Sequence, residues 1–157
     1  MKNTLKITAL FLILVLQTSC SFFGEENCDD IACFTPPNPI YFQLYSNQSD
    51  FIASDTFQLS KLKVSPLSSD ERLTLDTLVI EGNYYLRAEE IGWQQGLHNY
   101  GFMYGDEDLF TFSIDSNQIS EDCCAYTEYN EILITGADYE ELDSDIIDLV
   151  YKVYLNL

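Results

Sequence analysis

Residues 40–45 read IYFQLY, so that Ile40, Phe42 and Leu44 alternate with more polar side chains. Successive side chains of an extended strand point to opposite faces, and a period of two therefore predicts a strand with two unlike faces. Three prolines stand just before this stretch, within residues 36–39. Because proline cannot donate a hydrogen bond to a sheet, we expect the folded domain to begin near Ile40.

Similar alternating runs follow along the rest of the chain. The further predicted strands are residues 57–64, 73–80, 84–88, 99–104, 109–114, 128–135 and 149–157. Gly82 and Gly105 lie in short polar breaks at hairpin spacing. The eleven Tyr and ten Phe of the chain support this interpretation, since aromatic side chains suit a pleated, half-buried surface.

Helical patterns are confined to a short stretch at 144–150 and a single turn at 88–93. A parallel sheet would need intervening helices. The seven or eight short strands therefore predict an all-β fold, an antiparallel two-sheet sandwich of immunoglobulin-like or transthyretin-like type. A small barrel is the alternative.

The first twenty residues have the pattern of an export signal. Lys2 and Lys6 precede an apolar run at 7–16, and small residues lead into Cys20. A membrane-spanning helix needs about 20 apolar residues, so this run is too short to span. We expect residues 1–19 to be a lipoprotein signal peptide and Cys20 to be lipidated. A signal peptide cut without lipidation is the alternative.

The charge of the chain limits its partners. Its formal net charge is −19, with 7 Lys and Arg against 26 Asp and Glu. Nucleic acids and anionic lipid head groups need clustered basic residues, so neither is expected as a partner. The acyl chains of a lipidated Cys20 would hold the protein at a membrane without such a cluster. We expect residues 20–39 to form a Pro-rich, acidic tether and residues 40–157 one β-sandwich domain.

Four cysteines remain when Cys20 is set aside: Cys28, Cys33, Cys123 and Cys124. An exported chain meets an oxidising compartment, where thiols pair. We expect one or two disulfides between the tether and the loop at 121–124, in an order that the sequence leaves open. A zinc site is the alternative, but the C-x2-C spacing typical of zinc ligands is missing.

The N-terminal pattern resembles that of small lipoproteins of the Bacteroidota. It consists of Cys20, acidic residues and then the run CDDIACFTPP at 28–37, before an alternating strand. The pair Cys123-Cys124 and the strand predicted at the end of the chain are also similar to features of these lipoproteins. The resemblance implies a lipoprotein of the outer membrane, with a β-sandwich and no assigned activity.

Acidic clusters suggest one kind of ligand. Ca²⁺ binds carboxylate and carbonyl oxygens, and weak sites are common in exported modules. The candidate ligands are Asp106, Glu107 and Asp108 in a predicted hairpin loop, and Asp143 and Asp145 in a later connection. Neither stretch matches the D-x-[DN]-x-[DN]-G loop. The alternative is a solvated acidic face with no cofactor.

Aromatic residues suggest a second kind of ligand, a sugar. Trp93, in the loop-like run IGWQQG at 91–96, could form a platform for a sugar ring together with Tyr100. The alternative is that these aromatic side chains belong to the core. Nucleophilic catalysis with a histidine base would depend on His98, the single histidine. We therefore expect a cell-envelope binding or accessory module without catalytic activity, whose partner is an outer-membrane protein complex or, as the alternative, a surface glycan.

Overall fold

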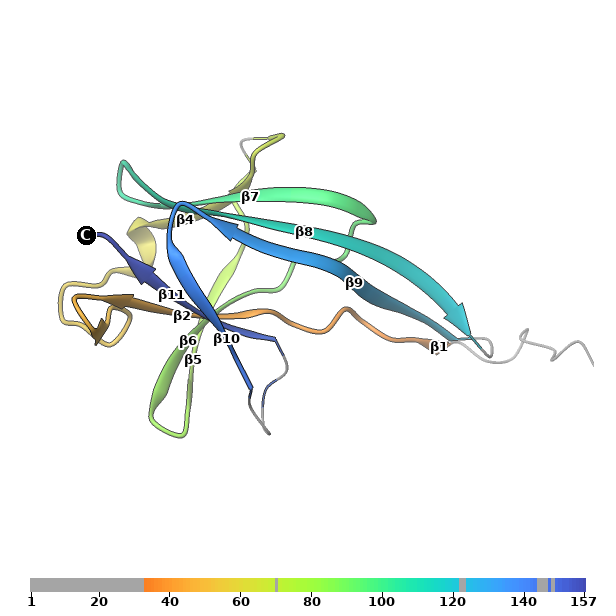
Figure 1. The fold of residues 1–157 in the computed structure, drawn as a ribbon, viewed down its shortest axis with the longest axis horizontal. Coiled ribbons are helices and arrows are strands. Elements are labelled where there is room, and N and C mark those ends of the chain that lie inside the picture. The colour runs from red at the N-terminus through yellow and green to blue at the C-terminus, as the bar shows by residue number, and fades with distance from the viewer. Residues whose placement is uncertain (1–32, 70, 122–123, 144–146, 148) are drawn as a thin grey trace, which may run out of the picture.

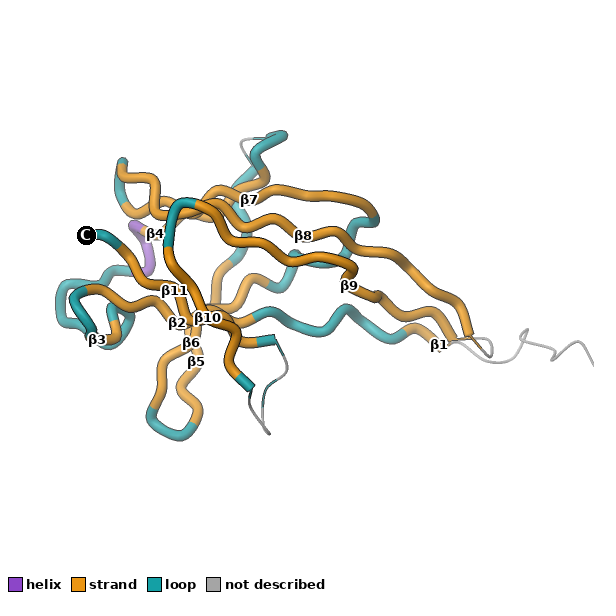
Figure 2. Tube along the Cα trace, viewed as in Figure 1, coloured by secondary structure: helices purple, strands orange, loops and turns teal. Residues whose placement is uncertain are grey.

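The structure is a computed structural model that describes residues 33–69, 71–121, 124–143, 147 and 149–157. Nearly all regular elements in these ranges are strands, joined by loops and one short 3-10 helix at Leu59–Lys61 (Figure 2). The strands are β1 (Cys33–Phe34), β2 (Tyr41–Ser46), β3 (Ser49–Asp50), β4 (Leu62–Pro66), β5 (Leu75–Ile80), β6 (Asn83–Ala88), β7 (Gly96–Tyr104), β8 (Glu107–Glu121), β9 (Cys124–Thr135), β10 (Asp138–Leu142) and β11 (Val150–Leu155).

The strands form two sheets that pack face to face (Figure 1). Sheet A has the order β1-β9-β8-β7-β4, and sheet B has the order β10-β11-β2-β6-β5, with β3 paired to β2. Each sheet ends in edge strands, so neither closes on itself. The predicted β-sandwich is confirmed, and the alternative of a small barrel is wrong.

Two strand pairs depart from the expected antiparallel arrangement. β11 pairs in parallel with β2, and β1 pairs in parallel with β9, whereas the other pairs are antiparallel. A period of two reports which face of a strand is buried, but not the direction of its neighbour. The sequence pattern therefore predicted these strands, but it could not predict that the two pairs are parallel.

The core lies between the two sheets and is rich in aromatic rings. Phe42 of β2 is fully buried, and its ring centroid lies 4.9 Å from that of Phe102 and 5.1 Å from that of Phe112. Ile40 and Leu44, which lie on the same face as Phe42, are buried as well. The alternation at residues 40–45 thus places the predicted apolar face inward, where burial of such side chains supplies the main stabilisation.

Strands β8 and β9 are longer than the sequence predicted. They form a hairpin that extends past the rest of the sandwich toward β1 (Figure 1). Of the expected loop at 121–124, residues 122–123 lie outside the described residues, while Glu121 and Cys124 pair at the far end of this hairpin. A β-bulge between Asp115 and Ser116 shifts the register within it. The hairpin thereby brings β9 beside the chain that leads into the domain.

A second apolar cluster covers the outer face of sheet B. Tyr85, Ile147 and Val150 are buried in it, and half-buried residues of β2, β5 and β10 pack around them. The acidic run at 138–142, which is not among the strands predicted from the sequence, is strand β10 at the edge of this sheet. Of the helix expected at 144–150, residues 144–146 and 148 lie outside the described residues. The single helical turn expected at 88–93 is not formed, since residues 89–95 make turns and bends between β6 and β7.

Candidate functional site

A cleft of about 730 Å³ opens between the two sheets, on the side where β9 faces β10. We call it the β9–β10 cleft. Its lining residues come from the segment before β2, the middle of β9, the end of β10 and the approach to β11: Asn38, Tyr126, Thr127, Glu128, Tyr129, Glu141, Leu142, Asp143, Ile147 and Leu149. Its volume lies in the range of sites that bind small ligands or a side chain of a partner.

The lining of the β9–β10 cleft is acidic. Glu128, Glu141 and Asp143 contribute three carboxylates, and none of the lining residues is Lys, Arg or His. A cleft lined by one sign of charge concentrates counter-ions and ligands of the opposite sign. This lining therefore favours a ligand that brings a positive charge or several hydrogen-bond donors.

Tyr129 forms one wall of the cleft and is held in place from two sides. Its hydroxyl donates a hydrogen bond of 2.8 Å to the backbone carbonyl of Asn38. On the other side lies Gly92, where a built Cβ atom would stand 2.3 Å from the Tyr129 hydroxyl oxygen. Burial raises the pKa of Tyr129 to about 12, with a smaller contribution from the neighbouring Tyr100. Tyr129 therefore stays a neutral hydrogen-bonding group at neutral pH.

A second tyrosine with a raised pKa, Tyr151, lies on β11, the strand that pairs with β10. Tyr151 of β11 is buried and pairs in register with Glu141. Burial, together with the nearby charge of Glu141, raises the pKa of Tyr151 well above its usual value. Glu141 thus lies between a buried phenol and the open cleft, where its carboxylate can accept a hydrogen bond from a ligand.

The segment before β2 is fastened to β9. β1 pairs with β9 so that Cys33 stands opposite Cys124, and the Thr35 amide donates to the Ala125 carbonyl at 3.0 Å. Of the cysteines expected to form disulfides, Cys28 and Cys123 lie outside the described residues, as does Cys20, the expected site of lipidation. The disulfides therefore stay a prediction. The backbone register is compatible with one of them, since it places Cys33 of the tether opposite Cys124 of β9.

The calcium ligands predicted from the sequence belong to two separate acidic stretches, at 106–108 and 143–145. Glu107 and Asp108 line a separate cavity of about 430 Å³ beside Asn156, and Asp106 lies in the turn before them. Asp143 lies in the β9–β10 cleft, and Asp145 is outside the described residues. The described residues hold no group of three or more His, Cys, Asp or Glu side chains arranged for a metal ion. Asp106, Glu107 and Asp108 thus form no such group, whereas a calcium site at Asp143 and Asp145 stays a prediction, because Asp145 is not described.

Of the two residues of the predicted aromatic platform, Trp93 is exposed and Tyr100 is buried. Trp93 is 54% exposed and lines a small cavity together with Gln94, Gln95, Gln118 and other residues. Its indole Nε1 donates a hydrogen bond to the Glu89 carbonyl at 2.7 Å. Tyr100, by contrast, is 4% exposed and belongs to the core between the sheets. Tyr100 cannot share a surface with Trp93, because it lies on the inward face of β7 together with Phe102.

The single histidine, His98, lies half-buried on β7, and its Nε2 atom hydrogen-bonds with the Gln95 carbonyl at 2.9 Å. It is not among the residues that line the β9–β10 cleft. The sequence analysis did not select Tyr129 or Glu128. The sequence of β9 itself contains no signal that β10 and Asn38 fold against this strand.

Comparison with protein families, curated proteins and solved structures finds no match to this chain. The part of the chain that the structure describes contains no helix with the length and apolarity of a membrane span.

Proposed function

We propose that this chain is a lipoprotein of the outer membrane that is anchored through Cys20 and binds a partner in the β9–β10 cleft, without catalysing a reaction. The observation that carries the binding role is the cleft itself, with three carboxylates, two tyrosines and no basic side chain in its lining. Such a lining suits an amine, such as a lysine side chain of a protein partner.

The anchor is supported by the N-terminal sequence. Twelve residues separate Cys20 from Cys33, and a fully extended chain spans about 3.4 Å per residue. An anchored domain would therefore sit within roughly 45 Å of the membrane, with the β1 end of the sandwich toward the lipid. A disulfide from the tether to β9 would hold the domain in that orientation.

Metabolic labelling with an alkyne fatty acid tests the anchor. We expect label on the wild-type chain and none on Cys20→Ala, while Cys28→Ala keeps the label and serves as the matched cysteine control. Labelled Cys20→Ala, or unlabelled wild type, would refute the lipidation.

Carbodiimide coupling in intact cells tests the cleft, because the reagent joins a carboxylate to an amine that touches it. We expect a covalent adduct whose linkage maps to Glu128, Glu141 or Asp143. Neutralising these three side chains as Glu128→Gln, Glu141→Gln and Asp143→Asn should abolish the adduct. A second triple variant, Asp55→Asn, Glu71→Gln and Asp106→Asn, has the same change in charge outside the cleft and should leave the adduct intact.

A surface glycan is the second candidate ligand, supported by the exposure of Trp93 beside Gln94, Gln95 and Gln118. Aromatic faces and amide groups together suit a sugar ring. Trp93 is the single tryptophan of the chain, so its fluorescence reports directly on this site. A titration with envelope polysaccharides should quench or shift it, and an unchanged spectrum would count against the glycan.

A further inference from the structure

Among the sheet edges in the described residues, the free edge of β5 carries the fewest features that block pairing. β5 is the last strand of sheet B, and its sequence LDTLVI contains one charged residue and no proline. Exposed edge strands present unpaired backbone groups that recruit further strands unless charges, proline, a bulge or a cover prevent it.

The other described edges carry such protection. β4 contains the exposed Lys63 and ends at Pro66. β10 bears the carboxylates of Asp138, Glu140 and Glu141. β9 is covered at one end by β1 and is interrupted by the bulge opposite Ser116. On β5 the single charge, Asp76, is paired with Arg87 at 3.1 Å.

The hairpin register identifies the backbone groups on this free edge. Ile80 pairs with Asn83 across a turn in which Glu81 and Gly82 both have positive φ. In such a two-residue hairpin the flanking pair is hydrogen-bonded, and bonded and non-bonded pairs then alternate along the ladder. The amides and carbonyls of Leu75, Thr77 and Val79 therefore point away from β6, and no backbone hydrogen bond from another described segment reaches them.

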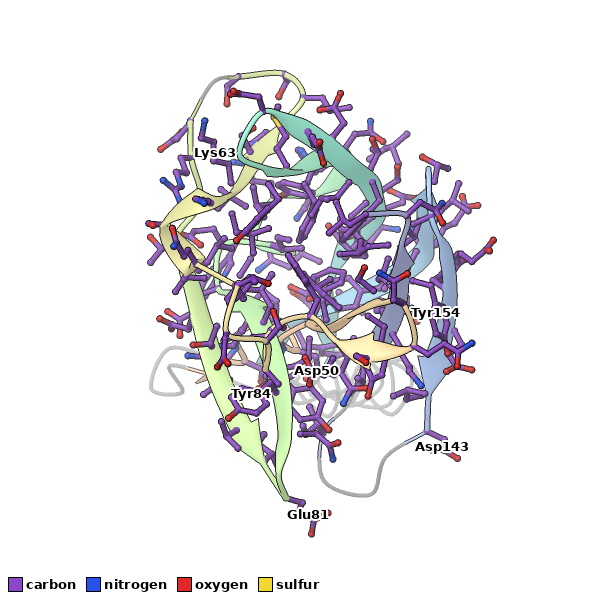
Figure 3. The ribbon with its side chains drawn as sticks, turned by 90° about the vertical axis from the view of Figure 1, so that its left-hand side faces the viewer. Asp50, Lys63, Glu81, Tyr84, Asp143 and Tyr154 are labelled. Carbon is purple, nitrogen blue, oxygen red and sulfur yellow. The ribbon has the colours of Figure 1, made fainter. Side chains whose placement is uncertain are left out.

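The hairpin also projects from the body of the domain. Figure 3 shows Glu81 at its tip, with Tyr84 nearby on the same hairpin. Val79 is 59% exposed and Tyr84, its partner in register, is 36% exposed. This apolar pair lies on one face of the hairpin at the β5 edge.

The opposite face of the same edge carries Asp76 together with the half-buried Leu78 and Ile80. Arg87 contacts the carboxylates of both Asp76 and Glu89, which leaves one negative charge in excess. The whole chain has a net charge of −19. This charge opposes pairing of β5 with a second copy and favours a cationic strand.

We infer that β5 is a docking edge for an extended segment of a partner protein in which apolar and basic residues alternate. The segment extends sheet B by one strand through backbone hydrogen bonds to Leu75, Thr77 and Val79. Its apolar side chains lie against Val79 and Tyr84, and its basic side chains lie on the face of Asp76. This edge adds a protein-docking surface to the proposed binding module, and its argument does not depend on the β9–β10 cleft.

The test uses the full chain in detergent and a short blocked peptide of alternating lysine and valine as the probe. Thr77→Pro removes one outward N–H without removing a bond to β6, and proline is tolerated on an edge strand. We expect the peptide to bind Thr77→Pro at least about tenfold more weakly than wild type. Thr77→Val, which keeps the N–H, should bind as wild type does, and a peptide of alternating lysine and glycine, with the same charge, should bind weakly.

A second variant, Val79→Lys, keeps the test decisive in case Thr77→Pro unfolds, because it opposes both the apolar contact and the charge of the peptide. Equal binding to wild type, Thr77→Pro and Val79→Lys would overturn the inference. So would a wild-type dimer that Thr77→Pro dissociates, since the edge would then be occupied by a second copy. Because the acidic cleft also suits a lysine side chain, the comparison of Thr77 with Thr77→Pro is repeated in the triple cleft variant. Loss of all peptide binding in that variant would place the peptide in the cleft and refute the β5 edge.

Discussion

The Tyr129 hydroxyl donates a 2.8 Å hydrogen bond to the carbonyl of Asn38, a residue 91 positions earlier in the chain. This bond ties the segment that enters the domain to the middle of β9. Tyr129→Phe should therefore lower the free energy of unfolding by about 0.5–1.5 kcal/mol, the usual net value of such a bond. Urea unfolding measures it, with the exposed Tyr84→Phe as control, for which we expect a change within about 0.5 kcal/mol.

Gly92 is required by its distance from the same ring. A Cβ atom at Gly92 would stand 2.3 Å from the Tyr129 hydroxyl oxygen, whereas one at Gly96 would meet nothing within 4 Å. Both glycines have φ of +91°, so alanine is strained equally at each. Gly92→Ala should destabilise the domain by about 1–3 kcal/mol more than Gly96→Ala, because overpacking adds to the strain. Similar unfolding midpoints for the two variants would refute the contact.

Stability should fall steeply at alkaline pH. Burial raises the pKa of Tyr129 to about 12 in the folded chain, whereas an unfolded tyrosine ionises near about 10. Between these values the unfolded chain binds fewer protons than the folded chain, so the free energy of unfolding decreases as pH rises. The raised pKa values of Tyr100 and Tyr151 act in the same direction. Urea midpoints across this window should fall less steeply for Tyr129→Phe, and an unchanged slope would contradict the assignment.

The register of β1 predicts one disulfide. Cys33 stands opposite Cys124 in a parallel ladder, where paired strands lie about 4.8 Å apart, within the Cα separation that a disulfide spans. We therefore predict a Cys33–Cys124 bond, which leaves Cys28 to pair with Cys123. Peptide mapping without reduction tests this order, and a fragment that joins Cys28 to Cys124 would exclude it.

Much of the fold could be predicted from local patterns. The alternation at 40–45 correctly placed Phe42 in the core, and Gly82 correctly marked a hairpin. The same alternation, applied to 99–104, puts Tyr100 on the face of Phe102 and could have predicted its burial. The sequence left open whether Trp93 belongs to the core, and the structure leaves its side chain 54% exposed.

The cleft could not be predicted in this way, because it depends on contacts between distant segments. The run at 138–142 has too many acids to resemble a strand, yet it pairs along its length with β11. Its position opposite β9 follows from the turn at Gly136, where the chain passes from sheet A to sheet B. Only this passage brings Glu141 to the same cleft as Glu128.

Photo-crosslinking from inside the cleft tests the central proposal most directly. A benzophenone side chain in place of Tyr126, an aromatic residue of the cleft lining, would be activated by light in intact cells. We predict one main adduct with a partner, which disappears when Glu128, Glu141 and Asp143 are neutralised and persists when Asp55, Glu71 and Asp106 are neutralised. No adduct, or an adduct that survives neutralisation of the cleft, would contradict the proposal that this cleft is the binding site.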